Sequence, residues 1–570
     1  MKMTGGEMVV RALEDEGIPF AFGIPGTHNL ELYDALAGAE KVRPVLVTDE
    51  QSASFMADGM ARASGKLGVV NVVPGAGLTH ALSGIAEAYL DGIPMLVLAC
   101  GIRTDTDKAF QLHDVDQLAI ARPVTKAQLR PASGAEIYAT IRRACRIART
   151  SPAGPVIVEI PVNYYLFRHD AEISASAESP LRTEPRAVEV AEVRALLAGS
   201  RRPLLYLGLG AADAGADLVT LAERLEAPVA TTFQGKGVFP ENHSLWLWCG
   251  FGEAAPPFVQ KVAAGCDLTL AIGCRFSEVG TGSYGLKPPG RLVHVDVDAG
   301  VIGKNYPAEV GVVADAAAFV EALLENLPER KADLAMREAI RAGHKEVWAE
   351  WAKQAGERIS PPHLLKLLQA ALGPGAIYTT DSGNGTFLAM ECLRLERPRS
   401  FLAPVDYSCM GYAVPAALGA ALACPDRPVA ALAGDGAFLM TVLELMTAAQ
   451  LQLPVMVLVL RDRELAQISQ FQETALGRKS CSELPDYDLA ALARGMGVEY
   501  LTMTRNAEVE SVLRGVRAIT AAGRPVLVEV EIDYSQKTYF TCGVVKTNFA
   551  RLPWGDRLRF VARALSRKLR

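Results

Sequence analysis

The sequence predicts an α/β protein made of three doubly wound domains with mainly parallel sheets. Two observations lead to this prediction. Helical patterns alternate with short β-rich runs along most of the 570 residues. Many of these runs end in glycine-rich or acidic loops, as strands of a parallel sheet do at their functional edge. We expect the domains at 1–168, 186–330 and 358–535, followed by a tail at 536–570.

Composition excludes several classes of function. Half of the residues are hydrophobic and the formal net charge is −6, so large cores are expected and nucleic-acid binding is not. The ten cysteines form no CxxC pair, which disfavours a zinc site and favours a cytoplasmic location. A long uncharged run, 407–425, is rich in alanine and glycine. It predicts a buried core helix, so a membrane partner is not expected.

Polar and glycine-rich loops follow the predicted strands of the first domain. The β-rich runs are 20–24, 42–47, 67–73, 95–99 and 156–160. Functional groups in such sheets lie at the carboxyl ends of the strands. The candidates there are Gly26, His28, Glu50, Pro74, Gln111 and His113.

The middle of the chain predicts a second α/β domain behind a linker at 170–185. Its β-rich runs are 204–207, 229–232, 268–272 and 292–295. Gly208 and Gly210 could suggest a dinucleotide turn, but the full GxGxxG pattern is missing. We therefore interpret them as a tight turn between a strand and a helix.

The third domain contains the clearest motif, a βαβ unit at 428–463. A strand at 429–433 ends in Gly434-Asp435-Gly436, and a helix at 440–451 leads to a strand at 455–460. Parallel strands joined by a crossover end at the same sheet edge, so Asp435 and Asp462 should be neighbours. Two carboxylates suit Mg²⁺, and glycine N–H groups at a helix start suit a phosphate.

This unit resembles the thiamine-diphosphate-binding motif. The whole chain is similar to the acetolactate synthase and pyruvate decarboxylase superfamily. Other motifs agree with the resemblance: Glu50 after a β-run, 74–77, 110–111, 303–305 and 410–412. The resemblance implies thiamine diphosphate and Mg²⁺ as cofactors. It also implies a homodimer or homotetramer with active sites between subunits.

The resemblance also implies roles for individual residues. Glu50 would protonate the pyrimidine ring of the cofactor at N1′, and Met410 would hold the cofactor bent. The metal ligands would be Asp435, Asp462 and the backbone oxygen of Glu464, with Asp462 standing where the family usually has asparagine. The other cofactor-binding residues would be Gly26, Pro74, Gly383, Asn384, Gly385, Ser408, Gly434, Gly436, Ala437, Leu465 and Ala466.

The resemblance to acetolactate synthase implies carboligation or decarboxylation of a 2-oxo acid such as pyruvate. Three departures leave FAD open: no arginine soon after Phe276, an altered segment at 249–253, and Phe471 where that enzyme usually has tryptophan. His28 and Gln111 match residues of benzaldehyde-lyase-type enzymes. The expected substrate-contacting residues are His28, Gln111, His113, Gln467 and Phe471.

Three alternatives remain open. The first is an acyloin lyase or ligase that acts on aldehydes or ketones, which the missing arginine favours. The second is a flavin-dependent pyruvate oxidase, supported only by a basic amphipathic helix at 553–570. We expect this helix to dock on the protein, with a membrane surface as the alternative. The third is a non-catalytic cofactor-binding homologue, against which the retained Glu50 and metal carboxylates argue.

Overall fold

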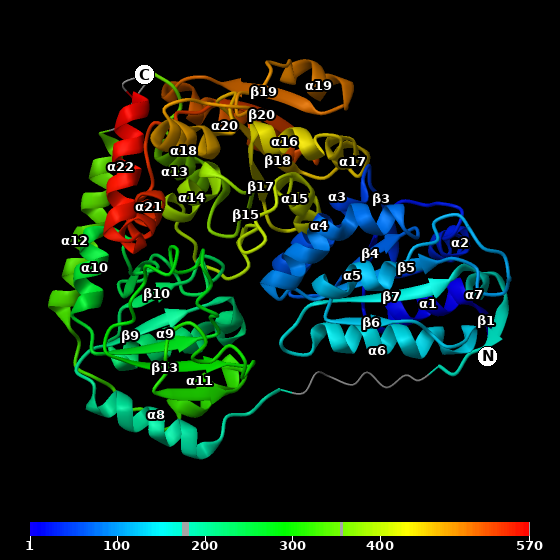
Figure 1. The fold of residues 1–570 in the computed structure, drawn as a ribbon, viewed down its shortest axis with the longest axis horizontal. Coiled ribbons are helices and arrows are strands. Elements are labelled where there is room, and N and C mark those ends of the chain that lie inside the picture. The colour runs from blue at the N-terminus through cyan, green and yellow to red at the C-terminus, as the bar shows by residue number, and fades with distance from the viewer. Residues whose placement is uncertain (174–181, 354–356, 569–570) are drawn as a thin grey trace.

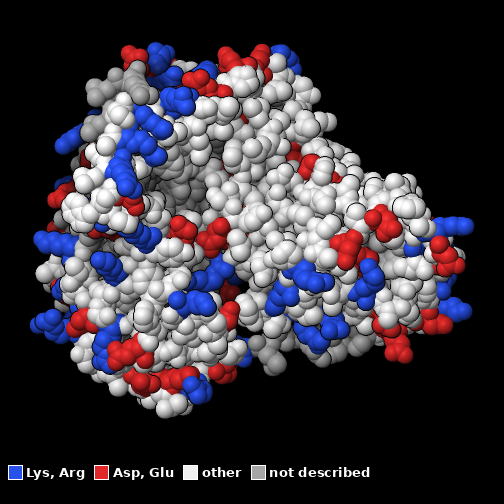
Figure 2. All heavy atoms as spheres, viewed as in Figure 1, with Lys and Arg blue, Asp and Glu red and all other residues white. Residues whose placement is uncertain are grey.

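Three α/β units, each built on a six-stranded parallel sheet, form the computed structural model (Figure 1). The structure describes residues 1–173, 182–353 and 357–568. Half of the expected linker, residues 174–181, therefore lies outside the described residues. On the face drawn in Figure 2, basic and acidic side chains are interspersed. No helix in the described ranges is long and apolar enough to cross a membrane.

The N-terminal sheet has the strand order β3-β2-β4-β5-β7-β6. All five expected strands are present, but the sequence prediction missed β6, whose three residues are all partly exposed. A small antiparallel pair, β1 (Lys2–Thr4) and β8 (Arg168–Asp170), was also missed. The strands of the main sheet are β2 (Phe20–Gly23), β3 (Arg43–Leu46), β4 (Gly68–Val72), β5 (Met95–Gly101), β6 (Ala127–Leu129) and β7 (Pro155–Pro161).

Different helices cover the two faces of this sheet. One face packs against α1 (Gly5–Asp15), α2 (Leu30–Ala37) and α6 (Ile137–Arg149). The other packs against α3 (Glu50–Ser64) and α4 (Ala76–Asp91). Two short helices, α5 (Gln117–Ala121) and α7 (Val162–Leu166), each contact β7.

The N-terminal and third domains meet through α3 and α15 (Ala413–Ala423). Gly59 of α3 and Gly419 of α15 each face the backbone of the opposite helix, with no room for a side chain. The two helices can therefore approach more closely than larger residues would allow. Because α15 is buried in this contact, the prediction of a core helix within 407–425 is confirmed.

The central sheet has the strand order β11-β10-β9-β12-β13-β14. Gly208 lies against the Gly273 backbone, in agreement with the predicted tight turn. The prediction missed β11 and β14. The strands are β9 (Pro203–Leu207), β10 (Val229–Thr231), β11 (Trp246–Cys249), β12 (Leu268–Ile272), β13 (Arg291–Asp296) and β14 (Val310–Val313); the helices are α8 (Ala187–Gly199), α9 (Gly215–Leu225), α10 (Pro257–Ala264) and α11 (Ala316–Leu324). The helix α12 (Leu334–Ala352) lies in the segment that connects the central domain to the third.

The third sheet has the strand order β16-β15-β17-β18-β20-β19. It carries the expected βαβ unit, but the single helix predicted at 440–451 is wrong. The chain instead forms α16 (Asp435–Thr441) directly after the strand, and then α17 (Glu444–Gln450). Between them the N–H groups of Leu445 and Met446 donate to carbonyls only three residues back. This tighter turn separates the two helices.

The remaining elements of the third domain also alternate between strands and helices, but the sequence prediction missed β16 and β19. The strands are β15 (Ile377–Thr380), β16 (Phe401–Leu402), β17 (Val429–Gly434), β18 (Val455–Arg461), β19 (Glu499–Met503) and β20 (Val526–Glu531). The helices are α13 (Pro361–Leu372), α14 (Asn384–Cys392), α18 (Ala466–Leu476), α19 (Leu489–Gly495) and α20 (Val509–Ala521).

The C-terminal tail forms α21 (Tyr539–Arg551) and α22 (Trp554–Lys568). The α22 helix docks on the protein as expected, because the Phe560 ring lies 6.1 Å from that of Phe549. It also packs beside α18 (Figure 1). The apolar side chains of Leu558 and Val561 on this amphipathic helix remain exposed. The side chains of Leu565 and Leu569 lie outside the described residues.

Candidate active site

A cavity lies at the carboxyl ends of three neighbouring strands of the third sheet, β15, β17 and β18. This position follows from the topology, since parallel strands end at one edge of the sheet. Most of the predicted cofactor and metal residues of this domain line it. They are Gly383, Asn384, Gly385, Met410, Gly434, Asp435, Gly436, Ala437, Asp462, Glu464, Leu465 and Ala466, together with the predicted substrate residue Gln467.

Three helices begin at this cavity, namely α14, α16 and α18. Their first N–H groups lack partners within the helix, and each helix start carries partial positive charge, so an anion is favoured there. Gly383, which precedes α14, has a φ of 137°, which L side chains rarely adopt. A side chain at Gly436 would place its first carbon 2.6 Å from a Leu465 methyl group. The glycines therefore keep the backbone accessible.

Asp435 and Asp462 bring two carboxylates into the cavity. The Asp435 carboxylate accepts hydrogen bonds from the N–H groups of Arg463 at 2.7 Å and Gly436 at 2.9 Å. Burial and the neighbouring Asp435 raise the pKa of Asp462 to about 7. A divalent cation would relieve this repulsion and replace the lost hydration, so the donor set fits a hard metal ion such as Mg²⁺.

The Arg461 side chain neither forms an ion pair with Asp462 nor points to solvent, although the sequence alone allows either arrangement. The Arg461 guanidinium is buried and pairs with Glu529 and Asp486. Arg463 also turns away, because its guanidinium binds Glu531 at 2.8 Å. Neither arginine therefore forms an ion pair with the carboxylates in the cavity, which leaves their charge for a metal ion.

The loop that carries Met410 is held from several sides. Met410 lines the cavity, whereas Ser408 lies beside it, with its hydroxyl 2.7 Å from that of Ser382. The Cys409 N–H donates to Glu87 of the N-terminal domain at 3.3 Å. The Tyr412 N–H donates to Asp381 at 2.6 Å. A Met410 side chain anchored in this way can act as a rigid support for a ligand.

Glu50 is the first residue of α3 and is largely buried. A side chain at Gly77 would reach within 3.0 Å of the Glu50 carboxylate, so glycine leaves room there. The His80 Nδ1 atom lies 3.6 Å from Glu50 and 3.3 Å from Asp49. Sequence reasoning missed His80, although its place in the helix that follows Pro74 could have indicated it.

His28 and His113 form a pair, with their ring centroids 5.3 Å apart in an edge-to-face arrangement. Burial, and secondarily His113, lowers the pKa of His28, which favours the neutral imidazole. The amide of Gln111 donates to the carbonyl of Arg103 at 3.0 Å. Gly26 lies against Val73, next to Pro74, so the glycine-rich loops of this domain meet at one edge.

The two groups of predicted residues do not share one cavity in a single chain. Every described residue that lines the cavity around Asp435 belongs to the third domain. Glu50, His28, Gln111 and His113 are not among them. Phe471 is also absent, because it lies one turn beyond Gln467 on α18 and is partly exposed.

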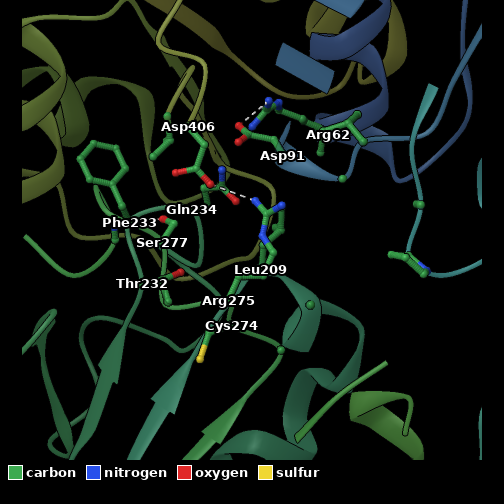
Figure 3. Close-up of a pocket in the computed structure, with 18 of the residues that line it drawn as sticks. Arg62, Asp91, Leu209, Thr232, Phe233, Gln234, Cys274, Arg275, Ser277 and Asp406 are labelled. Atoms are coloured by element: carbon green, nitrogen blue, oxygen red, sulfur yellow. Dashed lines mark hydrogen bonds and ion pairs between the residues drawn. The ribbon is translucent and has the colours of Figure 1, made fainter. Parts of the chain in front are cut away.

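A second cavity lies between the strand ends of the central sheet and the other two domains (Figure 3). Arg275 of the central domain binds Asp406 of the third domain at 3.0 Å, so an ion pair crosses this domain boundary. Arg62 binds Asp91 at 2.8 Å within the N-terminal domain. Burial raises the pKa of Asp296, which also lines the cavity, to about 6. The cavity therefore offers both cationic and anionic groups to a ligand.

Together, the fold and the first cavity are typical of an enzyme that binds a phosphorylated cofactor at the edge of a parallel sheet. Comparison with known families supports this class. Three family models match the chain: the thiamine pyrophosphate enzyme N-terminal TPP binding domain at 3–120, the central domain at 190–323 and the C-terminal TPP binding domain at 381–530.

Curated relatives match nearly the whole length. The probable acetolactate synthase large subunit of Methanocaldococcus jannaschii is 33% identical, covering 93% of this chain and 92% of the relative. The large subunit of acetolactate synthase isozyme 3 from Escherichia coli is 32% identical, covering 94% of this chain and 96% of the relative. The acetolactate synthase large subunit of Corynebacterium glutamicum is 32% identical, covering 93% of this chain and 86% of the relative. The chain belongs to the thiamine pyrophosphate enzyme family.

Proposed function

We propose that this chain is a thiamine-diphosphate- and Mg²⁺-dependent carboligase or decarboxylase that acts on a 2-oxo acid such as pyruvate. The observation that carries the proposal is the cavity in which Asp435, Asp462 and the glycines around them meet three helix starts. Curated relatives named acetolactate synthase support the choice of reaction. The bound cofactor would supply a nucleophilic thiazolium carbon that attacks a carbonyl group.

The residues of the third domain would hold the cofactor. Asp435, Asp462 and the backbone oxygen of Glu464 would bind Mg²⁺, which in turn binds the diphosphate. The N–H groups at 383–385 and 434–437 would donate to phosphate oxygens. Met410 would support the bend between the two rings of the cofactor.

The residues of the N-terminal domain would handle protons. The Glu50 carboxylate would hold a proton at N1′ of the pyrimidine ring, a task that suits a largely buried acid. The neutral His28, with His113 beside it, would exchange a proton with the substrate oxygen. Gln111, Gln467 and Phe471 would shape the substrate space.

The enzyme would work as a homodimer or homotetramer with active sites between subunits. Two observations support this assembly. Glu50 does not line the cavity that holds Asp435 in the same chain. Three large apolar side chains are about half exposed and would suit a subunit contact. They lie on α16 and in the segment that follows it, and are Met440, Leu443 and Met446.

All ten cysteines are free, which supports a cytoplasmic location.

The protein either binds FAD in the central cavity or lacks it, and the residues of this cavity favour neither state alone. Its size and its arginines, including Arg275, would suit a nucleotide. The residues that follow Phe276 include no arginine within the next ten positions, which disfavours the flavin arrangement of typical synthases. The visible absorption spectrum of the purified protein distinguishes the two states, since only bound FAD makes it yellow.

Release of CO₂ from pyruvate, in the presence of thiamine diphosphate and Mg²⁺, tests the proposed reaction. The second candidate is an acyloin lyase or ligase, which the lowered pKa of His28 favours because a neutral imidazole offers no fixed charge to a substrate carboxylate. Cleavage of an acyloin without turnover of any simple 2-oxo acid would establish this second candidate instead.

A further inference from the structure

Tyr534 lines the cavity around Asp435 and lies outside every motif that predicted the site. It follows β20 by three residues and is 8% exposed. Its hydroxyl approaches the glycine loop, because a side chain at Gly385 would place its first carbon 3.5 Å from this oxygen. The phenol therefore reaches the part of the cavity where the start of α14 offers its N–H groups.

The backbone around Tyr534 is held on both sides. The Ile532 N–H donates to Arg461 at 3.2 Å, and the Asp533 N–H donates to Ile359 at 2.9 Å. The carbonyl of Tyr534 accepts a hydrogen bond from Gln470 of α18 at 3.0 Å. The position of the phenol is thus set before any ligand binds, which lowers the entropic cost of using it in recognition.

The hydroxyl of Tyr534 makes no side-chain hydrogen bond among the described residues, and it borders the cavity rather than being sealed in the core. A donor in this position is available to a ligand. A tyrosine hydroxyl titrates at about pH 10, so at neutral pH it keeps its proton and can donate a hydrogen bond. An anionic oxygen in the cavity would satisfy this donor.

We propose that the Tyr534 hydroxyl is a hydrogen-bond donor to the diphosphate group bound in this cavity, and so a positioning residue for the cofactor. This inference rests on the proposed function, because it assumes that the cavity takes the diphosphate. It assigns to this chain a phosphate contact from the segment after β20, in addition to the helix starts and the metal ion.

The test compares Tyr534→Phe with a matched control, Tyr378→Phe. Tyr378 on β15 is also buried and its hydroxyl also lacks a partner, but it does not line the cavity. Thiamine diphosphate and inorganic diphosphate are each titrated, with Mg²⁺ present, by calorimetry. We expect Tyr534→Phe to weaken both ligands about ten- to hundredfold, as a lost hydrogen bond to a charged group would, and Tyr378→Phe to change neither.

Unfolding temperatures separate this role from a structural one. Without ligand, Tyr534→Phe should be as stable as the wild type or more stable, because the unpartnered hydroxyl is gone. With ligand, it should gain less stability than the wild type. Equal affinities in Tyr534→Phe and wild type, or equal losses in both tyrosine variants, would overturn the inference. If the wild type itself bound no thiamine diphosphate, the proposed function would fail first.

Discussion

Thr48 and Glu444 join the N-terminal domain to the third domain within one chain. The Thr48 backbone N–H donates to the Glu444 carboxylate at 2.9 Å, and the Thr48 hydroxyl donates to the same oxygen. The other carboxylate oxygen accepts from Thr447 at 2.7 Å. Thr48 ends the turn that leads to Glu50, and Glu444 begins the second helix after Asp435. The contact therefore fixes the orientation of the N-terminal domain against the third.

Replacing Glu444 by alanine should lower the free energy of unfolding by more than the loss of its side-chain contacts alone would. Glu444 is fully buried, so Glu444→Ala leaves the Thr48 and Thr447 donors without a partner. We expect a loss of about 2–3 kcal/mol in the free energy of unfolding, measured by urea denaturation. The exposed Glu510, paired with Arg514, provides the control, and Glu510→Ala should lose less than about 1 kcal/mol. Similar losses in both variants would contradict this account.

Glu50→Gln should separate cofactor binding from chemistry. Glutamine keeps the shape of Glu50 but cannot exchange a proton at N1′ of the cofactor. We expect turnover to fall at least about a hundredfold, while the affinity for thiamine diphosphate changes little. Exchange of the thiazolium C2 proton with deuterium, followed by NMR, measures the affected step directly.

Asp49→Asn is the matched control for Glu50→Gln. Asp49 caps α3 by accepting a hydrogen bond from the Gln51 N–H at 2.7 Å, and asparagine can cap in the same way. The exchange rate should therefore stay near that of the wild type. If Glu50→Gln exchanged as fast as Asp49→Asn, the role given to Glu50 would be wrong.

Asp462→Asn should change how metal binding depends on pH. Because the pKa of Asp462 is raised to about 7, a proton competes with the metal ion at neutral pH. The affinity of the wild type for Mg²⁺ should therefore fall as the pH is lowered from 8 to 6, by roughly tenfold for one displaced proton. Asparagine carries no such proton, so the variant should still bind Mg²⁺ and show a weaker pH dependence.

Calorimetric titration of each protein with Mg²⁺ and thiamine diphosphate, at several pH values, measures this difference. The comparison at pH 8 isolates the effect of charge, since Asp462 is then mostly ionised. Complete loss of metal binding in Asp462→Asn at every pH would show that the second carboxylate charge is required. An unchanged pH profile would show that another group titrates in this range.

Long buried strands could be predicted from the sequence, because apolar runs such as β12 (Leu268–Ile272) have no other good placement. Short strands such as β6 and β16 contain too few residues to produce such a signal. The break between α16 and α17 was also missed, since the apolar pattern continues through Val442 and Leu443. Local pattern therefore predicted the sheets better than the details of their connections.

In the candidate site, too, residues of a local motif were easier to predict than contacts between distant segments. Residues that belong to one motif, such as Gly434 and Asp435, could be predicted because the strand and the helix that position them are adjacent in sequence. Tyr534 and the partners of Arg461 could not, because the folded sheet brings them next to these motifs from distant segments. Glu529, for example, is 68 residues from Arg461. Such contacts depend on the order of strands in the sheet.

Mixing two inactive variants tests whether the active site forms between subunits. Glu50→Gln and Asp435→Asn should each be inactive alone. In a dimer that contains one chain of each kind, one site would combine an intact Glu50 with an intact Asp435, and the other site would carry both changes. Random exchange of subunits should therefore restore roughly a quarter of wild-type activity.

The control mixes Glu50→Gln with the double variant that carries Glu50→Gln and Asp435→Asn. No intact site can form in that mixture, so activity should stay at the background level. Recovery is measured as CO₂ release after the subunits have been dissociated and reassembled together, and light scattering confirms the assembly. If Glu50 and Asp435 served the same site within one chain, neither mixture would recover activity, and the proposed arrangement between subunits would be excluded.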